Sequence, residues 1–233
     1  MIRARSGRGA GTVLLCLAAL LVPAGCSRRA TPPAPPSPPA TPADPAIAEM
    51  APHLGEWLAL WRRVLPGVGA DSLRRVASGP FTLNDIHHID LDDREERARL
   101  RVFGVYSPDS TRVVNPDAYL VLTRTETSVS IAGEPDSKPV LIDLKTKSVA
   151  TLAFCGTDCH YDGAFWLDPL RFALTGSLVV NDSTGVRCGR VLLYDLNAGT
   201  MTEYRLPPLA DAVAWGPVAT AVDSALTARY RAR

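Results

Sequence analysis

Three cysteines in the second half of the chain are the residues best suited to chemistry. Cys155 and Cys159 lie close together in the segment Cys-Gly-Thr-Asp-Cys-His, and Cys188 follows further along the chain. In an oxidising compartment, this short loop with its glycine favours a Cys155–Cys159 disulfide. A bond from either cysteine to Cys188 is the alternative, and every pairing leaves one thiol free.

The same segment raises three further interpretations. Cys155-x-x-x-Cys159-His160 resembles a c-type haem attachment site with one residue too many, and no second axial ligand is evident. Zinc could be bound by the three cysteines with His160. A Cys159–His160 nucleophile would need a geometry that sequence neighbours seldom have. We therefore expect a disulfide at this segment, with no cofactor and no metal.

A second group of chemically able residues is the acidic segment over 84–96, which holds two of the four histidines. Metal could be ligated by His87, His88, Asp90 or Asp92. Adjacent residues of a strand point to opposite faces, however, so one site seldom uses both histidines. We expect a solvated edge strand or loop, and no catalytic residue stands out. The chain lacks Gly-x-Ser-x-Gly, a phosphate-binding loop with lysine, and His-Glu-x-x-His.

The N-terminus reads as an export leader. Arg3, Arg5 and Arg8 precede an apolar run over 12–22 that is too short to span a bilayer. The leader ends Leu21-Val-Pro-Ala-Gly-Cys26, which resembles the lipobox of bacterial lipoproteins. That resemblance implies that Cys26 carries lipid and becomes the first residue, and the absence of Asp after it implies the outer membrane. A simple secretory signal cleaved near Ala24-Gly25 is the alternative.

The residues after Cys26 predict a tether followed by one folded domain. Proline recurs through 32–45, where it prevents helix and sheet and favours extended chain. We place the signal peptide at 1–25, the lipidated cysteine and tether at 26–46, and a single globular domain at 47–233. The chain without its leader has 22 basic and 24 acidic side chains, so its charge indicates no nucleic-acid partner.

Within the domain, a helix is predicted over 53–65, a β region over about 80–207 and a terminal helix over about 219–231. Apolar residues at helical spacing support the first helix, and we expect this stripe to pack on the sheet or cover its edge rather than form a sugar platform. We expect Leu100–Tyr106 to form a strand and Trp166 to be a core residue. The stripe consists of Leu54, Trp57, Leu58, Trp61 and Leu65.

An internal repeat predicts two hairpins. Ile142-Asp143-Leu144 and Tyr194-Asp195-Leu196 are 52 positions apart, and a polar turn and an alternating apolar run follow each. The aspartates are expected to accept hydrogen bonds from turn amides. The pattern over about 100–207 resembles blades of a bacterial β-propeller. It implies a mainly β fold of antiparallel hairpins, as an incomplete propeller or a twisted pair of sheets.

The overall pattern is also similar to uncharacterised bacterial lipoproteins, a resemblance that implies no activity. We expect a membrane-anchored binding or structural module of the cell envelope, with the membrane and an envelope protein as partners. The alternative is a periplasmic or surface hydrolase with an Asp/His site on loops, because catalytic triads need not be local in sequence.

Overall fold

The computed structural model describes residues 44–124, 129–132, 136–211, 214–216, 218–221, 224 and 228. The chain divides into Met1–Thr41, which lies outside the described residues, and a compact unit over Pro42–Arg233. The predictions on the leader, on Cys26 and on most of the tether therefore stay predictions. No helix among the described residues is long and apolar enough to cross a bilayer.

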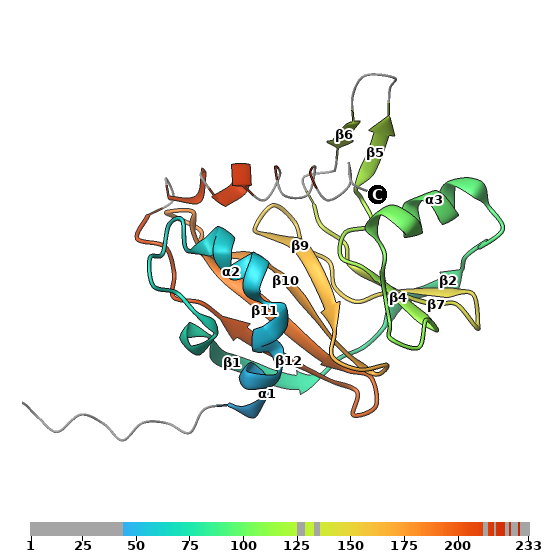
Figure 1. Ribbon diagram of the computed structural model, residues 1–233, viewed down its shortest axis with the longest axis horizontal. Coiled ribbons are helices and arrows are strands. Elements are labelled where there is room, and N and C mark those ends of the chain that lie inside the picture. The colour runs from blue at the N-terminus through green and yellow to red at the C-terminus, as the bar shows by residue number, and fades with distance from the viewer. Residues whose placement is uncertain are drawn as a thin grey trace, which may run out of the picture. The chain divides into compact units, whose positions relative to one another are not determined.

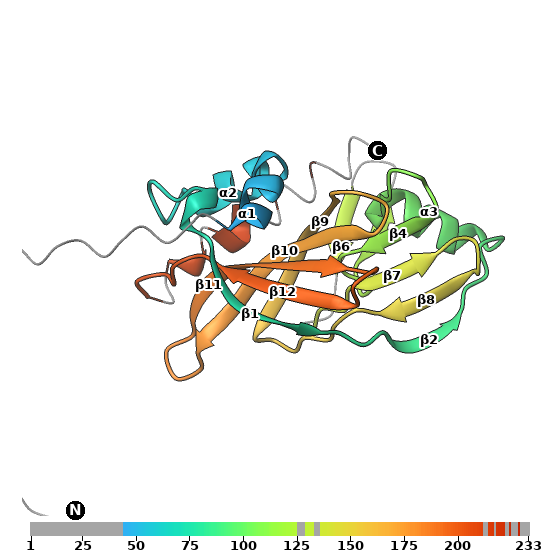
Figure 2. The same ribbon diagram turned by 90° about the horizontal axis from the view of Figure 1, so that it is seen from below.

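Two antiparallel five-stranded sheets form the body of this unit, so the prediction of a mainly β fold is confirmed (Figures 1 and 2). Sheet A has the order β1 (Arg74–Pro80), β12 (Thr200–Arg205), β11 (Val186–Asp195), β10 (Arg171–Asn181) and β9 (Cys159–Trp166). Sheet B has the order β2 (Asn84–His88), β8 (Ser148–Thr151), β7 (Val140–Asp143), β4 (Arg112–Asn115) and β3 (Val105–Tyr106). A separate hairpin joins β5 (Val121–Arg124) to β6 (Val129–Ala132).

The two sheets share one topology. In each, four strands pair in chain order as an antiparallel meander, which in sheet B is interrupted by the β5–β6 hairpin between β4 and β7, and a strand from earlier in the chain is added at one edge. The added strands are β1 in sheet A and β2 in sheet B, so the β region begins at Arg74 rather than near 80. A four-strand meander is the pattern of a propeller blade but also of other antiparallel sheets. The resemblance to propeller blades therefore stays a prediction.

The predicted repeat forms equivalent hairpins, β7–β8 and β11–β12. The Asp143 carboxylate accepts hydrogen bonds from the next two turn amides at 3.0 and 2.9 Å, and Asp195 does the same at 2.9 and 2.8 Å. Four positions after each aspartate the backbone is left-handed, at Lys147 (φ 52°) and Gly199 (φ 64°). The prediction that these aspartates stabilise turns is confirmed.

The N-terminal helical segment differs from the single helix predicted over 53–65. It consists of α1 (Pro45–Met50), a 3-10 turn η1 (Ala51–His53) and α2 (Gly55–Trp61). Pro52 has no amide hydrogen to continue α1, so the chain tightens there and restarts. Asp44 caps α1 by accepting a hydrogen bond from the Ala46 amide at 3.0 Å, so folded chain begins before residue 47. A further 3-10 turn, η2 (Ala70–Ser72), leads into β1.

The segment 94–106 corrects a prediction. Leu100–Tyr106 was expected to be a strand, but α3 spans Arg94–Phe103 and only Val105–Tyr106 pair as β3. Asp93 caps the helix through hydrogen bonds from the amides of the first turn at 2.7 and 2.9 Å. Arginine, glutamate, alanine and leucine are good helix formers, and the capped start outweighs the short apolar alternation.

The buried residues form three layers of core. The first lies between the N-terminal helices and one face of sheet A, and it includes Leu54, Trp57, Leu58, Trp61, Ala173, Val191 and Tyr204. The second lies between the two sheets and includes Val114, Leu141, Trp166, Phe172, Leu174 and Tyr194. The third joins sheet B to α3 and includes Leu100, Val113, Ile142 and Val149. The helical stripe thus packs on a face of sheet A and does not cover an edge.

Trp166 belongs to the core between the sheets, as predicted. Its side chain is buried, its ring centroid is 4.9 Å from that of Phe172, and the two residues are register partners across β9 and β10. The C-terminal prediction is only partly covered. The described residues within 215–228 are helical, and the rest of the helix predicted over 219–231 lies outside the described residues.

Candidate functional site

The histidine-containing segment borders a cavity of about 400 Å³ that is lined by α3 and by sheet B, including its edge strand β2. We call this cavity the β2–α3 pocket. Ligand sites in proteins commonly have volumes of about 300–1,000 Å³, with an apolar floor and a few polar groups. This pocket has that composition. Its floor is formed by Ile89, Leu100, Val140, Ile142 and Val149, and its polar residues are His87, His88, Asp90, Glu96, Arg99, Asn115, Tyr119 and Lys138.

An irregularity in β2 shapes the edge of the pocket. The register with β8 shifts between Asn84 and His87, and Asp85 has a left-handed backbone with φ 49°. The Asp85 carboxylate Oδ2 lies 3.8 Å from Lys138 Nζ and accepts a 3.5 Å hydrogen bond from Thr151. Bulges and left-handed residues often occur beside binding sites, where they redirect side chains.

Both histidines are exposed on the edge strand, as expected for a solvated edge. His87 Nδ1 lies 2.7 Å from the carbonyl oxygen of Asp85. A carbonyl acceptor favours the tautomer with the proton on Nδ1, which leaves Nε2 with a lone pair. The ring of His88 makes no hydrogen bond with another described residue. His87 is therefore the better oriented of the two rings.

The helical wall of the pocket is fixed by Arg99. Its Nη1 donates to the carbonyl oxygen of Ala118 at 3.2 Å, and its Nη2 pairs with the Glu96 carboxylate. The opposite charges of Glu96 and Arg99 thus neutralise each other on one turn of α3. Arg99 also links the helix to the loop after β4. This wall offers hydrogen-bonding groups with little net charge.

A buried carboxylate that sequence reasoning missed supports the opposite wall. Asp117 Oδ1 accepts from the amides of Tyr119 (3.0 Å) and Lys138 (3.3 Å), and Oδ2 accepts from the hydroxyl of Ser137 at 2.9 Å. Its own amide donates to Asn115 Oδ1 at 3.1 Å. Asp117 therefore positions Tyr119 and Lys138 at the pocket. The turn signal Asn-Pro-Asp at 115–117 was the available clue.

The structure does not assemble the metal site considered for 84–96. Asp92 instead lies 3.6 Å from Lys147 Nζ, and the Asp90 carboxylate accepts from the Asp92 amide at 2.9 Å. Across the described part of the chain, no three histidine, cysteine or acidic residues are grouped as metal ligands.

The cysteines follow the first prediction. Cys155 and Cys159 form a disulfide, and Cys188 is free and buried. The bond consumes both thiols, so thioether attachment of haem, the zinc set and a Cys159 nucleophile are wrong for this form of the chain. Burial raises the pKa of the Cys188 thiol, which keeps it neutral and poorly nucleophilic.

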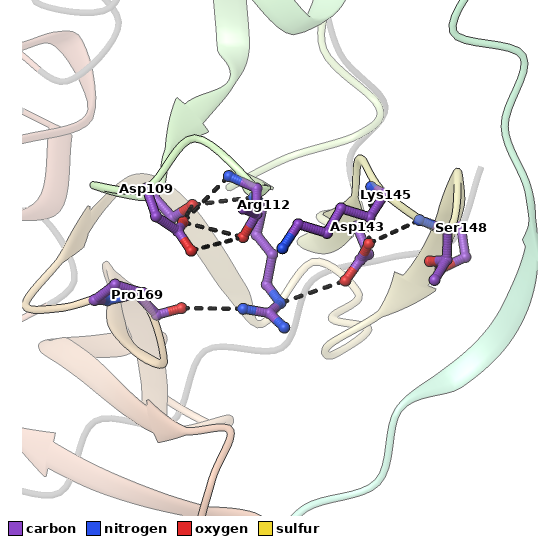
Figure 3. A network of polar contacts seen from close by, with 9 residues as sticks. Asp109, Arg112, Asp143, Lys145, Ser148 and Pro169 are labelled. Atoms are coloured by element: carbon purple, nitrogen blue, oxygen red, sulfur yellow. Dashed lines mark hydrogen bonds and ion pairs between the residues drawn. The ribbon is translucent and has the colours of Figure 1, made fainter.

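The carboxylates on the loops serve turns rather than a site. Figure 3 shows Arg112 between Asp143, whose Oδ2 lies 3.5 Å from Nε, and the carbonyl oxygen of Pro169, 3.3 Å from Nη1. Asp109 accepts from the Ser107 hydroxyl at 2.7 Å and from the Thr111 amide at 3.1 Å. This network ties turns of sheet B to the β9–β10 turn of sheet A, and it explains these aspartates without chemistry.

The arrangement in the β2–α3 pocket can hold a small molecule by apolar contact and hydrogen bonding. Among the described residues, no hydrogen bond or ion pair joins His87 or His88 to a carboxylate, so the base–orienter pair of an acid–base site is not formed. No protein-family model matches the chain, and neither curated proteins nor solved structures gave a significant match.

Proposed function

We propose that the chain is a lipid-anchored binding module of the bacterial cell envelope. The observation that carries this proposal is the order of segments before the folded unit: a basic region, a short apolar run, small residues, Cys26 and a proline-rich stretch. The first described residue, Asp44, already caps α1. In this proposal, residues 27–43 form the tether between the lipid on Cys26 and the folded domain.

The tether sets how far the domain can stand from the membrane. Residues 27–43 lie between Cys26 and the α1 cap, and extended polyproline-like chain rises about 3.1 Å per residue, so the reach is roughly 50 Å. Acyl chains contribute roughly 0.8 kcal/mol per buried CH₂, and two or more chains hold a protein stably at a bilayer. The partners in this proposal are the membrane, through the lipid, and a ligand or envelope protein at the domain.

Intact-mass analysis of the protein extracted from bacterial membranes tests the anchor. The expected mass is that of residues 26–233 plus the acyl groups on Cys26. A Cys26→Ala variant should lose this modification and leave the membrane fraction. A mature N-terminus at another residue, or an unmodified Cys26 in the wild-type protein, would refute the proposal.

The β2–α3 pocket supports binding better than hydrolysis. Glu96 is neutralised by Arg99, and one oxygen of the Asp90 carboxylate accepts a hydrogen bond from a backbone amide. The loop aspartates are likewise occupied by turn amides. Among the described residues, the pocket therefore has groups that can bind a ligand but has no paired acid and base.

A hydrolase of the periplasm or cell surface is the second candidate, because His87 has an oriented ring at a pocket that Asp90 also borders. Hydrolysis of p-nitrophenyl esters by the purified chain tests it. A hydrolase would show turnover that His87→Ala abolishes and that His53→Ala, a substitution outside the pocket, leaves unchanged. The binding module should show no turnover that depends on His87.

A further inference from the structure

A second cavity, of about 520 Å³, is lined by residues of β1, β12, β11 and β10 in sheet A. We call it the Arg74–Arg205 pocket, after the two arginines from adjacent strands that line it. Val76, Val180, Cys188 and Pro208 also line it. None of these residues borders the β2–α3 pocket, so the two cavities are distinct.

Two β-bulges place apolar side chains at this pocket. The pairing of β1 with β12 skips Val76, and the pairing of β10 with β11 skips Val180. Both valines are consequently exposed, at 49% and 39% of their surface. Bulges redirect side chains and are frequent beside functional sites. Two independent bulges therefore present exposed valines to one cavity.

A row of arginines crosses the same part of the sheet. Arg205 is the register partner of Arg74 on one side and of Arg190 on the other, so all three side chains share one face. Like charges directly opposite each other destabilise a sheet. The sequence thus retains an unfavourable arrangement at the wall of the pocket.

One buried carboxylate offsets only part of this charge. Glu203, with 8% of its side chain exposed, places Oε1 2.8 Å from Arg205 Nε and 3.1 Å from Arg190 Nε. Arg74 donates to the carbonyl oxygen of Leu73 at 2.9 Å. Asp71 also lines the pocket, so the three arginines and two acids leave one positive charge.

Arg205 is the residue of this row best placed to bind a ligand. Its Nε is held by Glu203, whereas its two Nη groups donate to no other described residue. A guanidinium presents two parallel N–H groups that match the oxygens of a carboxylate or phosphate. The exposed side chains of Val76 and Val180 add apolar surface beside this fork.

We propose that the Arg74–Arg205 pocket binds an amphiphilic oxyanion, a phosphate or carboxylate group that carries an apolar chain. Arg205 binds the oxyanion, Arg74 contributes positive charge, and the two bulged valines contact the chain. The same chemistry occurs in soluble phosphate esters and in phospholipid headgroups. The pocket recognises the shared combination of an oxyanion with an adjacent apolar group.

Calorimetric titration of the purified full chain tests this proposal with water-soluble probes. Hexyl phosphate should bind with one-to-one stoichiometry and about tenfold more tightly than inorganic phosphate or hexanol, each of which offers half of the recognised chemistry. Dihexanoyl phosphatidylglycerol distinguishes the sources: tighter binding than hexyl phosphate indicates a lipid headgroup, and weaker binding indicates a soluble ester. Both outcomes support the site.

Two substitutions in the pocket and one control outside it distinguish binding at this pocket from binding at any positively charged surface. Arg205→Gln should weaken hexyl phosphate binding about tenfold, because it removes a charge-assisted bidentate contact. Arg75→Gln is the matched control, since Arg75 is the register partner of Tyr204 and lies 3.8 Å from Asp44, on the other face. Val180→Ser, at the exposed rim, keeps the fold and should reduce the advantage of hexyl over inorganic phosphate.

Thermal unfolding of each variant verifies its fold before titration. The proposal is overturned if the wild-type chain binds neither hexyl phosphate nor the phospholipid. It is equally overturned if folded Arg205→Gln and Val180→Ser bind as the wild type does, or if Arg75→Gln weakens binding as much as Arg205→Gln.

Discussion

The indole nitrogen of Trp166 donates a hydrogen bond to the carbonyl oxygen of Val105 across 2.8 Å. Trp166 ends β9 and Val105 begins β3, and these strands are the edges at which sheets A and B meet. The same ring packs on Phe172 within the core between the sheets. One side chain thus supplies both a polar and an apolar contact to the junction.

Replacing Trp166 should therefore loosen the junction between the sheets. Trp166→Ala is expected to lower the free energy of unfolding by about 3–5 kcal/mol, because it leaves a cavity in a buried core. Trp166→Phe keeps an aromatic ring but removes the indole donor to the Val105 carbonyl, and should cost about 0.5–1.5 kcal/mol. Urea denaturation measures both. Unchanged stability in Trp166→Ala would instead indicate a surface aromatic.

The two equivalent hairpins provide a matched pair of substitutions. Lys147 and Gly199 occupy the same left-handed position, which costs an L-residue roughly 1–2 kcal/mol and glycine much less. We expect Lys147→Gly to raise the free energy of unfolding by about 1 kcal/mol. Gly199→Ala should lower it by about the same amount, since no heavy atom lies within 4 Å of the added methyl.

Lys147 also forms an exposed ion pair with Asp92, so a control is needed. Lys147→Ala removes the pair but keeps the left-handed strain, and a surface pair contributes only about 0–1 kcal/mol. If Lys147→Gly and Lys147→Ala have the same stability in chemical denaturation, backbone strain is not the cause.

Local patterns were sufficient for much of the fold. The alternating apolar residues around Asp143 and Asp195 specified two hairpins, because strand period and turn chemistry agree there. Trp166 was recognisable as a core residue because it follows Phe165 and precedes Leu170, Phe172 and Leu174, which alternate along one strand face. The Cys155–Cys159 disulfide followed from short spacing. In each case the partners are close in sequence or share one strand.

Features that depend on register or distant contacts were not predictable. The arginine row exists because β1 and β11 both pair with β12, and no local pattern specifies the pairing of β1 with β12. Asp117 became a support for the β2–α3 pocket through contacts with residues about 20 positions away. The helix α3 was missed for a different reason, since Leu100 and Val102 alternate as in a strand while the Asp93 cap determines the outcome.

The turn aspartates predict how stability depends on pH. A hydrogen bond from the Ser107 hydroxyl chiefly lowers the pKa of Asp109. For Asp143 and Asp168, burial raises the pKa, but hydrogen bonds from the turn amides and the charge of Arg112 or Arg171 together outweigh burial, so the pKa is lowered. An unfolded Asp has a pKa of about 3.9. A lowered folded pKa contributes stability above that value, and this stability is lost as pH falls through the folded pKa.

Denaturation midpoints measured between pH 7 and pH 2 should therefore stay level above about pH 5 and fall below about pH 4. Asp168→Asn should make the acid branch shallower, since it removes one of the titrating groups. Asp182→Asn is the control, because Asp182 is exposed in the β10–β11 turn and its carboxylate bonds to no other described residue. Acid branches that are equally steep in the wild type and Asp168→Asn would contradict this account.

Gly189 lies where α2 packs on sheet A. A methyl group added there would lie 2.7 Å from Leu206 Cδ1 and 3.0 Å from Cη2 and Cζ2 of Trp57, closer than packed atoms approach. Gly189→Ala must therefore push α2 outward or distort β11, and overpacking of this kind costs typically 1–3 kcal/mol. Gly79→Ala is the matched control in β1, where nothing lies within 4 Å of the new methyl. We expect Gly189→Ala to lower the urea midpoint and to shift tryptophan emission to longer wavelength, while Gly79→Ala changes the emission little. Equal stability and emission in the two variants would mean that α2 does not pack on the sheet and is free to bind a partner.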